Sequence, residues 1–168
     1  KVEPGLTSPL LTAVLPVLQT LDEAVDTGRE REWVPAATTL VGLGTGLTPS
    51  GDDFLIGFLS VLALMEERNQ RIAGFASALR STIKDALFQT TSLSREFFCC
   101  ACAGEYSEPF HELYTAAEIL DGQKTLAAAI RFAGIGHTSG VDSLSGILYG
   151  FRFCCRLLYG CLPGDLGR

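Results

Sequence analysis

A short pattern occurs twice in this sequence, each time at the start of a long apolar segment. Residues 50–57 (SGDDFLIG) and 139–146 (SGVDSLSG) both fit the pattern S-G-x-D-x-L-x-G. Each copy follows a glycine-containing segment that carries a threonine, Thr48 in the first and Thr138 in the second. A polar start in front of an apolar run is typical of a helix N-terminus. The pattern therefore predicts two long helices that begin alike.

The acid and the last glycine of each copy are four residues apart, as in Asp53 and Gly57 or Asp142 and Gly146. Residues at this spacing lie on the same face of a helix. Glycine on that face lets another backbone approach closely, because it has no side chain. We therefore expect the two helices to cross at their glycines and both polar starts to lie at one end of the bundle.

Apolar residues recur at helical spacing along most of the chain, and no segment shows the strong alternation of a surface strand. The segments predicted to be helical are residues 9–26, 29–41, 52–69, 70–88, 92–104, 109–120, 124–133 and 139–159. The inward face of the last one is predicted to carry Leu144, Ile147, Leu148, Phe151, Cys155 and Leu158.

The expected fold is all-α, an orthogonal bundle of about seven to eight helices with two glycine-rich loops at residues 42–50 and 134–138. The length of the chain predicts a single domain over residues 1–168. Because the chain starts at Lys1 and not at Met, we expect it to be a fragment that lacks an N-terminal region.

The composition argues against several classes of partner. Hydrophobic residues make up 47% of the chain, yet the longest apolar stretch, Phe54 to Met65, is too short to span a membrane. The net charge is −6 and Lys and Arg form no cluster, so we expect no nucleic-acid partner and no membrane partner. We expect no signal peptide ahead of the six cysteines, and we therefore expect free thiols in a reducing cytoplasm.

Cys99 and Cys102 form a C-x-x-C pattern in the middle of a predicted helix. Redox-active pairs are usually found at a helix start, and a structural zinc site needs a second pair at matching spacing. Cys154 and Cys155 do not provide that spacing. We therefore expect these cysteines to pack in the core.

The two polar starts allow a structural and a functional interpretation. In the structural one, Ser50 and Ser139 are N-caps, and the acid of each copy reaches back to the cap N–H as in a capping box. In the functional one, free N–H groups and the positive end of the helix dipole bind a phosphate or a carboxylate. Because three carboxylates repel a bare phosphate, Asp52, Asp53 and Asp142 then either act in capping or hold a cation such as Mg²⁺.

Two further polar residues lie near predicted helix starts. Arg95 follows a cluster of Thr and Ser and can clamp a carboxylate or a phosphate with two parallel hydrogen bonds. The alternative for Arg95 is an exposed side chain beside a serine cap. His137 precedes Thr138 in the second glycine loop and is a candidate proton carrier or anion donor. The alternative for His137 is a hydrogen bond within the loop.

Three segments together resemble a known family. Residues 42–55 (GLGTGLTPSGDDFL) resemble its most distinctive motif. Thr90-Thr91 with Ser94, followed by residues 103–105 (AGE), resembles the second, and residues 136–142 (GHTSGVD) with Leu144 and Gly146 resemble the third. This family was first catalogued as a domain of unknown function, and it is linked to a subunit of the oxamate carbamoyltransferase of anaerobic allantoin degradation. The resemblance covers roughly residues 36–150, and the chain looks like the C-terminal helical part of the family's members.

The resemblance implies carbamoyl transfer between carbamoyl phosphate and oxamate, giving or consuming oxalurate, by a complex of several subunits. It implies a small anionic substrate at the glycine-rich helix starts, with catalytic groups among His137, Asp53 and Asp142. The residues expected to bind the substrate are Gly46, Thr48, Ser50, Gly51, Arg95, Thr138, Ser139 and Gly140. Any metal ion, such as Mg²⁺, is expected at Asp52, Asp53 and Asp142.

Few Lys or Arg residues lie near these motifs, although carbamoyl transfer needs donors on the phosphate and on the carbamoyl oxygen. We therefore expect other subunits of the same enzyme complex to supply part of the active site. Two alternatives stay open at this point. One is a non-catalytic assembly subunit of a multi-subunit enzyme, and the other is a metal-dependent phosphate-handling protein.

Overall fold

The computed structural model describes residues 9–27 and 33–160. Within these ranges the elements are α1 (Pro9–Thr27), α2 (Trp33–Thr38), α3 (Ser50–Glu66), α4 (Gln70–Ala86), the 3₁₀ turn η1 (Leu87–Gln89), α5 (Ser92–Cys102), α6 (Glu108–Glu118), α7 (Gly122–Ala133) and α8 (Ser139–Tyr159). None of the described elements is a strand, which confirms the predicted all-α fold. No helix in this part of the chain is long and apolar enough to cross a membrane.

The predicted helix bounds agree with the structure for most elements. The second predicted helix differs most, because α2 ends at Thr38 and tight turns lead from it to Gly42, whose φ is +75°. The predicted start of that helix at Arg29, and Cys161, lie outside the described residues.

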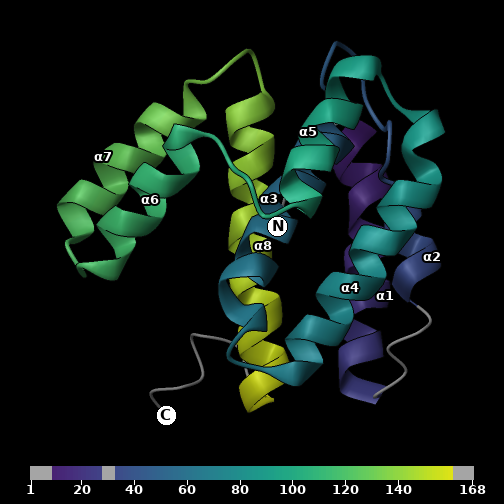
Figure 1. The fold of residues 1–168 in the computed structure, drawn as a ribbon, viewed down its shortest axis with the longest axis horizontal. Coiled ribbons are helices and arrows are strands. Elements are labelled where there is room, and N and C mark those ends of the chain that lie inside the picture. Colours follow the sequence, from purple (N-terminus) through teal and green to yellow (C-terminus); the bar gives the residue numbers. More distant parts are fainter. Residues whose placement is uncertain (1–8, 28–32, 161–168) are drawn as a thin grey trace, which may run out of the picture.

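α3 and α8 cross in the middle of the fold with their N-terminal ends on the same side (Figure 1). A Cβ built on Gly57 would lie 2.1 Å from the carbonyl oxygen of Ser143, and one built on Gly146 would lie 2.0 Å from the carbonyl oxygen of Phe54. Phe54 and Ser143 occupy the same position in the two copies of the repeat, three residues before the glycine. The predicted crossing is therefore confirmed, and the two copies face each other across an approximate two-fold axis.

α3 is enclosed by its neighbours. Every residue from Gly51 to Leu62 is buried, which fits the apolar run that the sequence shows there. α8, α4, α5 and α1 all pack against this helix. A helix that is apolar all round needs such a surrounding, so the central position of α3 follows from its composition.

The inward face of α8 differs from the predicted one. Leu148 is 70% exposed and Phe151 is 39% exposed, although both were expected to point inward. The buried face carries small residues instead, among them Gly140, Ser143, Gly146 and Gly150, together with Ile147 and Phe153. The prediction is correct for Ile147, and Leu144 and Leu158 pack partly buried against the core. It is wrong for Leu148 and Phe151 because it counted large apolar residues, whereas a close crossing selects residues with little or no side chain.

A row of aromatic rings connects α8 with three other helices. The ring of Phe153 meets Phe58 edge-on at 5.3 Å and Phe75 edge-on at 4.9 Å between centroids. Phe75 also stacks on Trp33 at 5.0 Å. Aromatic pairs in these geometries contribute about 0.5–1.5 kcal/mol each beyond the area they bury. The row of rings thus joins α2, α3, α4 and α8.

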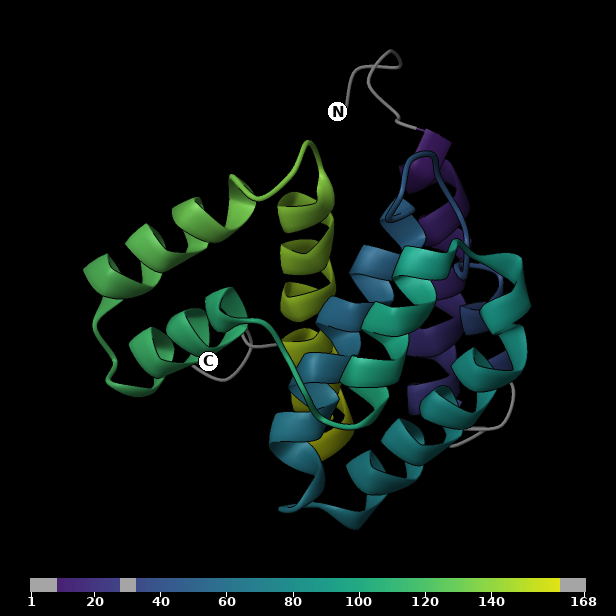
Figure 2. The ribbon, with the colours of Figure 1, turned by 45° about the horizontal axis from the view of Figure 1, so that its top comes forward.

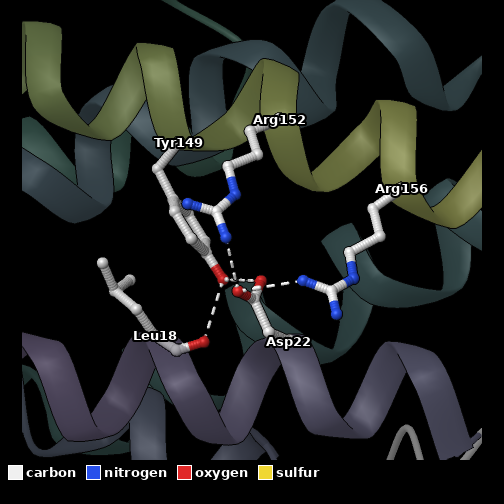
Figure 3. A network of polar contacts seen from close by, with 5 residues as sticks. All are labelled: Leu18, Asp22, Tyr149, Arg152 and Arg156. Carbon is white, nitrogen blue, oxygen red and sulfur yellow. Dashed lines mark hydrogen bonds and ion pairs between the residues drawn. The ribbon is translucent and has the colours of Figure 1, made fainter. Parts of the chain in front are cut away.

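A polar network fastens α1 to α8 (Figure 3). The Tyr149 hydroxyl donates to the carbonyl oxygen of Leu18 at 3.3 Å and to Asp22 Oδ1 at 3.2 Å. Arg152 and Arg156 reach Asp22 Oδ2 at 2.8 and 3.1 Å. Burial raises the pKa of the Tyr149 phenol, with the negative charge of Asp22 adding to the effect. The phenol therefore stays protonated and acts as a donor.

α6 and α7 form a hairpin that extends to one side of the other helices (Figure 2). The ring of Phe110 in α6 meets the ring of Phe132 in α7 edge-on, with 4.8 Å between centroids. The ring centroid of Tyr106 lies 5.4 Å from that of Phe110. α7 also packs against α8. The hairpin thereby places a group of aromatic residues beside the N-terminal ends of α3 and α8.

Candidate functional site

A cavity of about 520 Å³ lies where the N-terminal ends of α3 and α8 meet α5 and the α6–α7 hairpin. Its wall consists of Thr48, Asp53, Ile56, Phe97, Cys100, Glu105, Tyr106, Ser107, Phe110, Phe132, Ile135, Gly136, Ser139, Gly140 and Ser143. Its volume is within the range of pockets that hold small molecules. The wall is apolar on the side of the hairpin and polar where the two repeats meet.

Asp53 is the buried acid in this wall. Its exposed fraction is 6%, and among the described residues its Oδ2 atom has no hydrogen-bond partner. The hydroxyls of Thr48 and Ser139 lie 2.9 Å apart, so the segment before α3 is joined to the start of α8 beside this carboxyl. A buried polar atom without a partner is rare in proteins and marks a position for a ligand or a proton.

Burial raises the pKa of the Asp53 carboxyl from 3.8 to about 6. Hydrogen bonding with Ser139 and Thr48 opposes this rise, and the negative charges of Asp142 and Asp52 add to it. A carboxyl whose pKa lies near neutrality can gain and lose a proton under cellular conditions, as a general acid or base must.

Asp142 is the counterpart of Asp53 in the second repeat. Its Oδ2 atom is buried and also lacks a hydrogen-bond partner in the described part of the chain. It does not belong to the cavity wall, but its charge acts on Asp53. The approximate two-fold relation between the repeats therefore brings two acids close together, with one of them facing the cavity.

Asp52 has a structural role. It is fully buried, its Oδ1 accepts the backbone N–H of Gly42 at 2.7 Å, and its Oδ2 accepts the hydroxyl of Thr90. A Cβ built on Gly42 would lie 2.3 Å from the carbonyl oxygen of Gln89, so the segment before α3 passes very close to the end of η1, just before α5. Asp52 thereby ties the first glycine-rich segment to α5 and is not part of the cavity wall.

The predicted capping boxes are wrong. Pro49 and Thr138 occupy the N-cap positions, neither makes a side-chain cap hydrogen bond, and Ser50 and Ser139 are the first helical residues. The reason is visible at Ser139, whose hydroxyl bonds to Thr48 of the other repeat and so is not used within its own helix start.

Several predicted site residues lie outside the cavity wall. Arg95 donates to the carbonyl oxygen of Thr90 at 3.3 and 3.0 Å from its Nε and Nη2 atoms. His137 is exposed. Gly51 packs against the backbone of Leu40, where a Cβ would lie 2.1 Å from the carbonyl oxygen. The predicted residues that the wall does not contain are Gly46, Ser50, Gly51, Asp52, Arg95, His137, Thr138 and Asp142, and those that it contains are Thr48, Asp53, Ser139 and Gly140.

The wall also contains polar residues that sequence reasoning missed. Ser143 follows Ser139 by one helical turn and so shares its face, a signal that was present in the sequence. Tyr106 and Ser107 belong to the connection between α5 and α6, which no pattern marks. Glu105 closes the second family motif, but nothing in the motif indicated that it would face a cavity.

The cysteines of α5 do not pack as expected. Cys99 and Cys100 are exposed and Cys102 is half-buried, because the buried face of this helix carries Ser94, Phe98 and Ala101 instead. The prediction of core packing for the C-x-x-C pair is therefore wrong for Cys99, and Cys102 is only half-buried. The five described cysteines are all free thiols, as predicted, and Cys100 is part of the cavity wall.

The candidate metal ligands do not come together as a set. Within residues 9–27 and 33–160 no group of three or more His, Cys, Asp or Glu side chains has a geometry suited to a metal ion. Asp52 is used in hydrogen bonds to Gly42 and Thr90. The acids that remain at the repeat interface are Asp53 and Asp142.

Comparison with known proteins bears on the family of this chain. No curated protein and no solved structure matches it. A protein-family model described as oxamate carbamoyltransferase subunit AllH matches residues 40–151, which include both copies of the repeat and every residue of the cavity wall. The match spans well over half of the sequence. The chain therefore belongs to the oxamate carbamoyltransferase subunit AllH family.

Proposed function

We propose that this chain is a subunit of an enzyme that transfers a carbamoyl group between carbamoyl phosphate and oxamate. The family supports the reaction and the assignment to a subunit. The observation that carries a site in this chain is the unpartnered carboxyl of Asp53, buried in the wall of the cavity. The proposal places the protein in the cytoplasm and in anaerobic allantoin degradation, as the resemblance implies.

Asp53 has the properties of a proton acceptor for this transfer. Toward oxalurate, the amide nitrogen of oxamate forms a bond to the carbamoyl carbon, the bond between that carbon and the phosphate oxygen breaks, and phosphate leaves with the electron pair. The nitrogen loses one proton, which the Asp53 carboxylate accepts. A pKa of about 6 leaves this carboxyl mainly ionised at neutral pH and still basic enough to take the proton.

The neighbours of Asp53 serve to orient the substrate. The hydroxyls of Thr48 and Ser139 lie beside the carboxyl, and Gly140 lets the start of α8 pack against the backbone of Phe132 in α7. Asp142 acts through Asp53, since its negative charge helps to keep the pKa of that carboxyl raised. The proposal assigns no role to Arg95 or His137, because neither is part of the wall.

Other subunits complete the site in this proposal. None of the described residues in the wall is Lys, Arg or His, and carbamoyl phosphate needs cationic or other strong donors on its phosphate. A partner subunit that covers the cavity would supply them. The small anionic substrate would then lie between this chain and its partner.

Reconstitution with the partner subunits tests the proposal. The complex should form oxalurate and phosphate from oxamate and carbamoyl phosphate. Asp53→Asn should lower turnover by about a hundredfold or more and leave assembly intact. Asp85→Asn, at an exposed carboxyl on α4, should leave both unchanged. Failure of the wild-type complex to form oxalurate would overturn the proposal.

A non-catalytic assembly subunit is the second candidate. The observation that favours it is a set of exposed apolar side chains, with Leu126 at 62% and Ile130 at 64% on one face of α7 and Leu148 at 70% on α8. In this case the complex would lose activity with Leu126→Ser and Ile130→Ser through failed assembly, whereas Asp53→Asn would leave turnover unchanged. Loss of turnover without loss of assembly in Asp53→Asn would favour catalysis.

A further inference from the structure

The charges around the cavity limit which part of a substrate it can hold. The described wall contains the carboxyls of Asp53 and Glu105 and no cationic side chain. A phosphate placed here would carry up to two negative charges toward these acids. Burying an anion without a partner of opposite charge is strongly unfavourable. The dipoles of α3 and α8, which favour negative charge at their N-terminal ends, offset at most a fraction of this.

The hydrogen-bonding groups of the cavity indicate that its ligand is a hydrogen-bond donor. When ionised, the Asp53 carboxylate can only accept hydrogen bonds, and its Oδ2 atom has no donor within the described residues. A primary amide offers two N–H donors on one nitrogen and one carbonyl acceptor. The hydroxyl oxygens of Thr48 and Ser139 lie beside the carboxylate and can accept the second N–H of that amide.

The rest of the wall suits a small flat group. Phe97, Phe110 and Phe132 contribute aromatic surface, and Ile56 adds an aliphatic side chain from α3. Such surface gains free energy from contact with the uncharged faces of an amide and gains nothing from contact with a hydrated phosphate.

We infer that this cavity binds the amide end of the acceptor oxamate, with its NH₂ group on Asp53 Oδ2, and does not bind the phosphate of carbamoyl phosphate. The inference rests on the proposed function, since it names which substrate this subunit holds. The carboxylate of oxamate then points away from Asp53, toward the cationic groups that the partner supplies. The two substrates are thus divided between two subunits, and the new C–N bond forms where they meet.

The steady-state kinetics of the complex show which of the two substrates depends on Asp53 for binding. Asp53→Asn should raise the KM for oxamate at least about tenfold, as expected for loss of a hydrogen bond to a charged group. It should change the KM for carbamoyl phosphate less than about twofold, and the residual rate suffices for this measurement. Asp85→Asn is the control. A complex that forms oxalurate, but in which Asp53→Asn raises the KM for carbamoyl phosphate instead, would overturn the inference and leave the proposed function standing.

Alkylation of two cysteines of α5 tests ligand binding in the cavity without a measurement of turnover. Cys100 belongs to the wall, whereas Cys99, one residue earlier, is exposed outside it. In the Cys99→Ser protein, oxamate should slow alkylation of Cys100 by iodoacetamide several-fold, and inorganic phosphate should not. In the Cys100→Ser protein neither should slow alkylation of Cys99. Mass spectrometry of the peptide that contains both positions measures the extent of alkylation.

Addition of Asp53→Asn to the Cys99→Ser protein should remove the protection by oxamate. Protection of Cys100 by phosphate and not by oxamate would contradict the inference. Equal protection by both anions would do so as well, because it would show that the cavity does not discriminate. These outcomes are independent of oxalurate formation, so a failed inference and a failed proposed function give different results.

Discussion

The carbonyl oxygen of Ser143 occupies the space that a side chain at position 57 would need. A Cβ built on Gly57 would lie 2.1 Å from that oxygen, and the backbones of α3 and α8 are in contact there. The separation of the two helices also fixes the distance between their polar starts. The 2.9 Å contact between the hydroxyls of Thr48 and Ser139 depends on it, and so does the shape of the cavity beside them.

A methyl group at position 57 should therefore force the helices apart. We expect Gly57→Ala to lower the free energy of unfolding by about 3 kcal/mol, the upper end of the usual cost of overpacking, because the obstructing atom belongs to the backbone. Urea denaturation followed by circular dichroism measures this. Gly74→Ala on α4 is the matched control, since a Cβ there meets nothing within 4 Å. It should raise stability by about 0.5–1 kcal/mol. Equal effects of the two substitutions would contradict the close crossing.

The helices and their central crossing could be predicted from the sequence because both depend on local patterns. Periodicity defines a helix, and the repeated glycine marks the face where the other backbone fits. The inward face of α8 could not be predicted from apolar periodicity. The spacing of apolar residues predicts that Leu148 lies in the core, but Leu148 is 70% exposed, because the glycines near it pack against α3 instead.

The candidate site could be predicted in part. The repeat located Thr48, Asp53 and Ser139, and the crossing brought them together. The capping prediction failed at Ser139 because its hydroxyl finds a partner in the other repeat, a tertiary contact that no local rule contains. Tyr106 and Ser107 reach the cavity from a connecting segment, so their place in the wall depends on how the α6–α7 hairpin packs.

Thr90 should be essential to the stability of the first glycine-rich segment. Its hydroxyl donates to Asp52, which is fully buried and also accepts the N–H of Gly42. Thr90→Val removes one donor from a buried carboxyl, which should lower the free energy of unfolding by about 2–3 kcal/mol. Thr39→Val is the control, because the Thr39 hydroxyl is exposed and bonds within its own turn, and it should cost less than about 1 kcal/mol. A similar loss in both variants, by urea denaturation, would show that Asp52 does not depend on Thr90.

The polar network between α1 and α8 should contribute less to the free energy of unfolding than the hydrogen bond from Thr90 to Asp52. Tyr149→Phe removes the hydroxyl that donates to Leu18 and Asp22 and leaves the ring in place, so we expect a loss of about 1 kcal/mol. Tyr159→Phe, at a residue that is 65% exposed, should change stability very little. A double-mutant cycle with Asp22→Asn measures the coupling. Full additivity of the two substitutions would mean that the hydroxyl and the carboxylate do not interact.

The raised pKa of Asp53 should make the stability of the protein depend on pH in a defined direction. Its pKa is 3.8 for the free side chain and about 6 in the folded protein, so between these values the folded state binds more protons than the unfolded one. The stabilising contribution of protonated Asp53 is therefore complete below pH 4 and is lost as pH rises through about 6. At neutral pH the ionised, buried carboxyl lowers the free energy of unfolding by about 2–3 kcal/mol relative to acid conditions.

Asp53→Asn removes this titration, since the amide is neutral at every pH and has nearly the same shape. The difference in free energy of unfolding between Asp53→Asn and the wild type should grow in favour of the variant as pH rises from 4 to 7, with its midpoint between the two pKa values. Asp85→Asn, at an exposed carboxyl, provides the control and should show a difference that hardly changes with pH. Urea denaturation at half-unit pH intervals measures both. A constant difference between Asp53→Asn and the wild type would show that burial does not raise the pKa of Asp53, and it would remove the basis for its role as a proton acceptor.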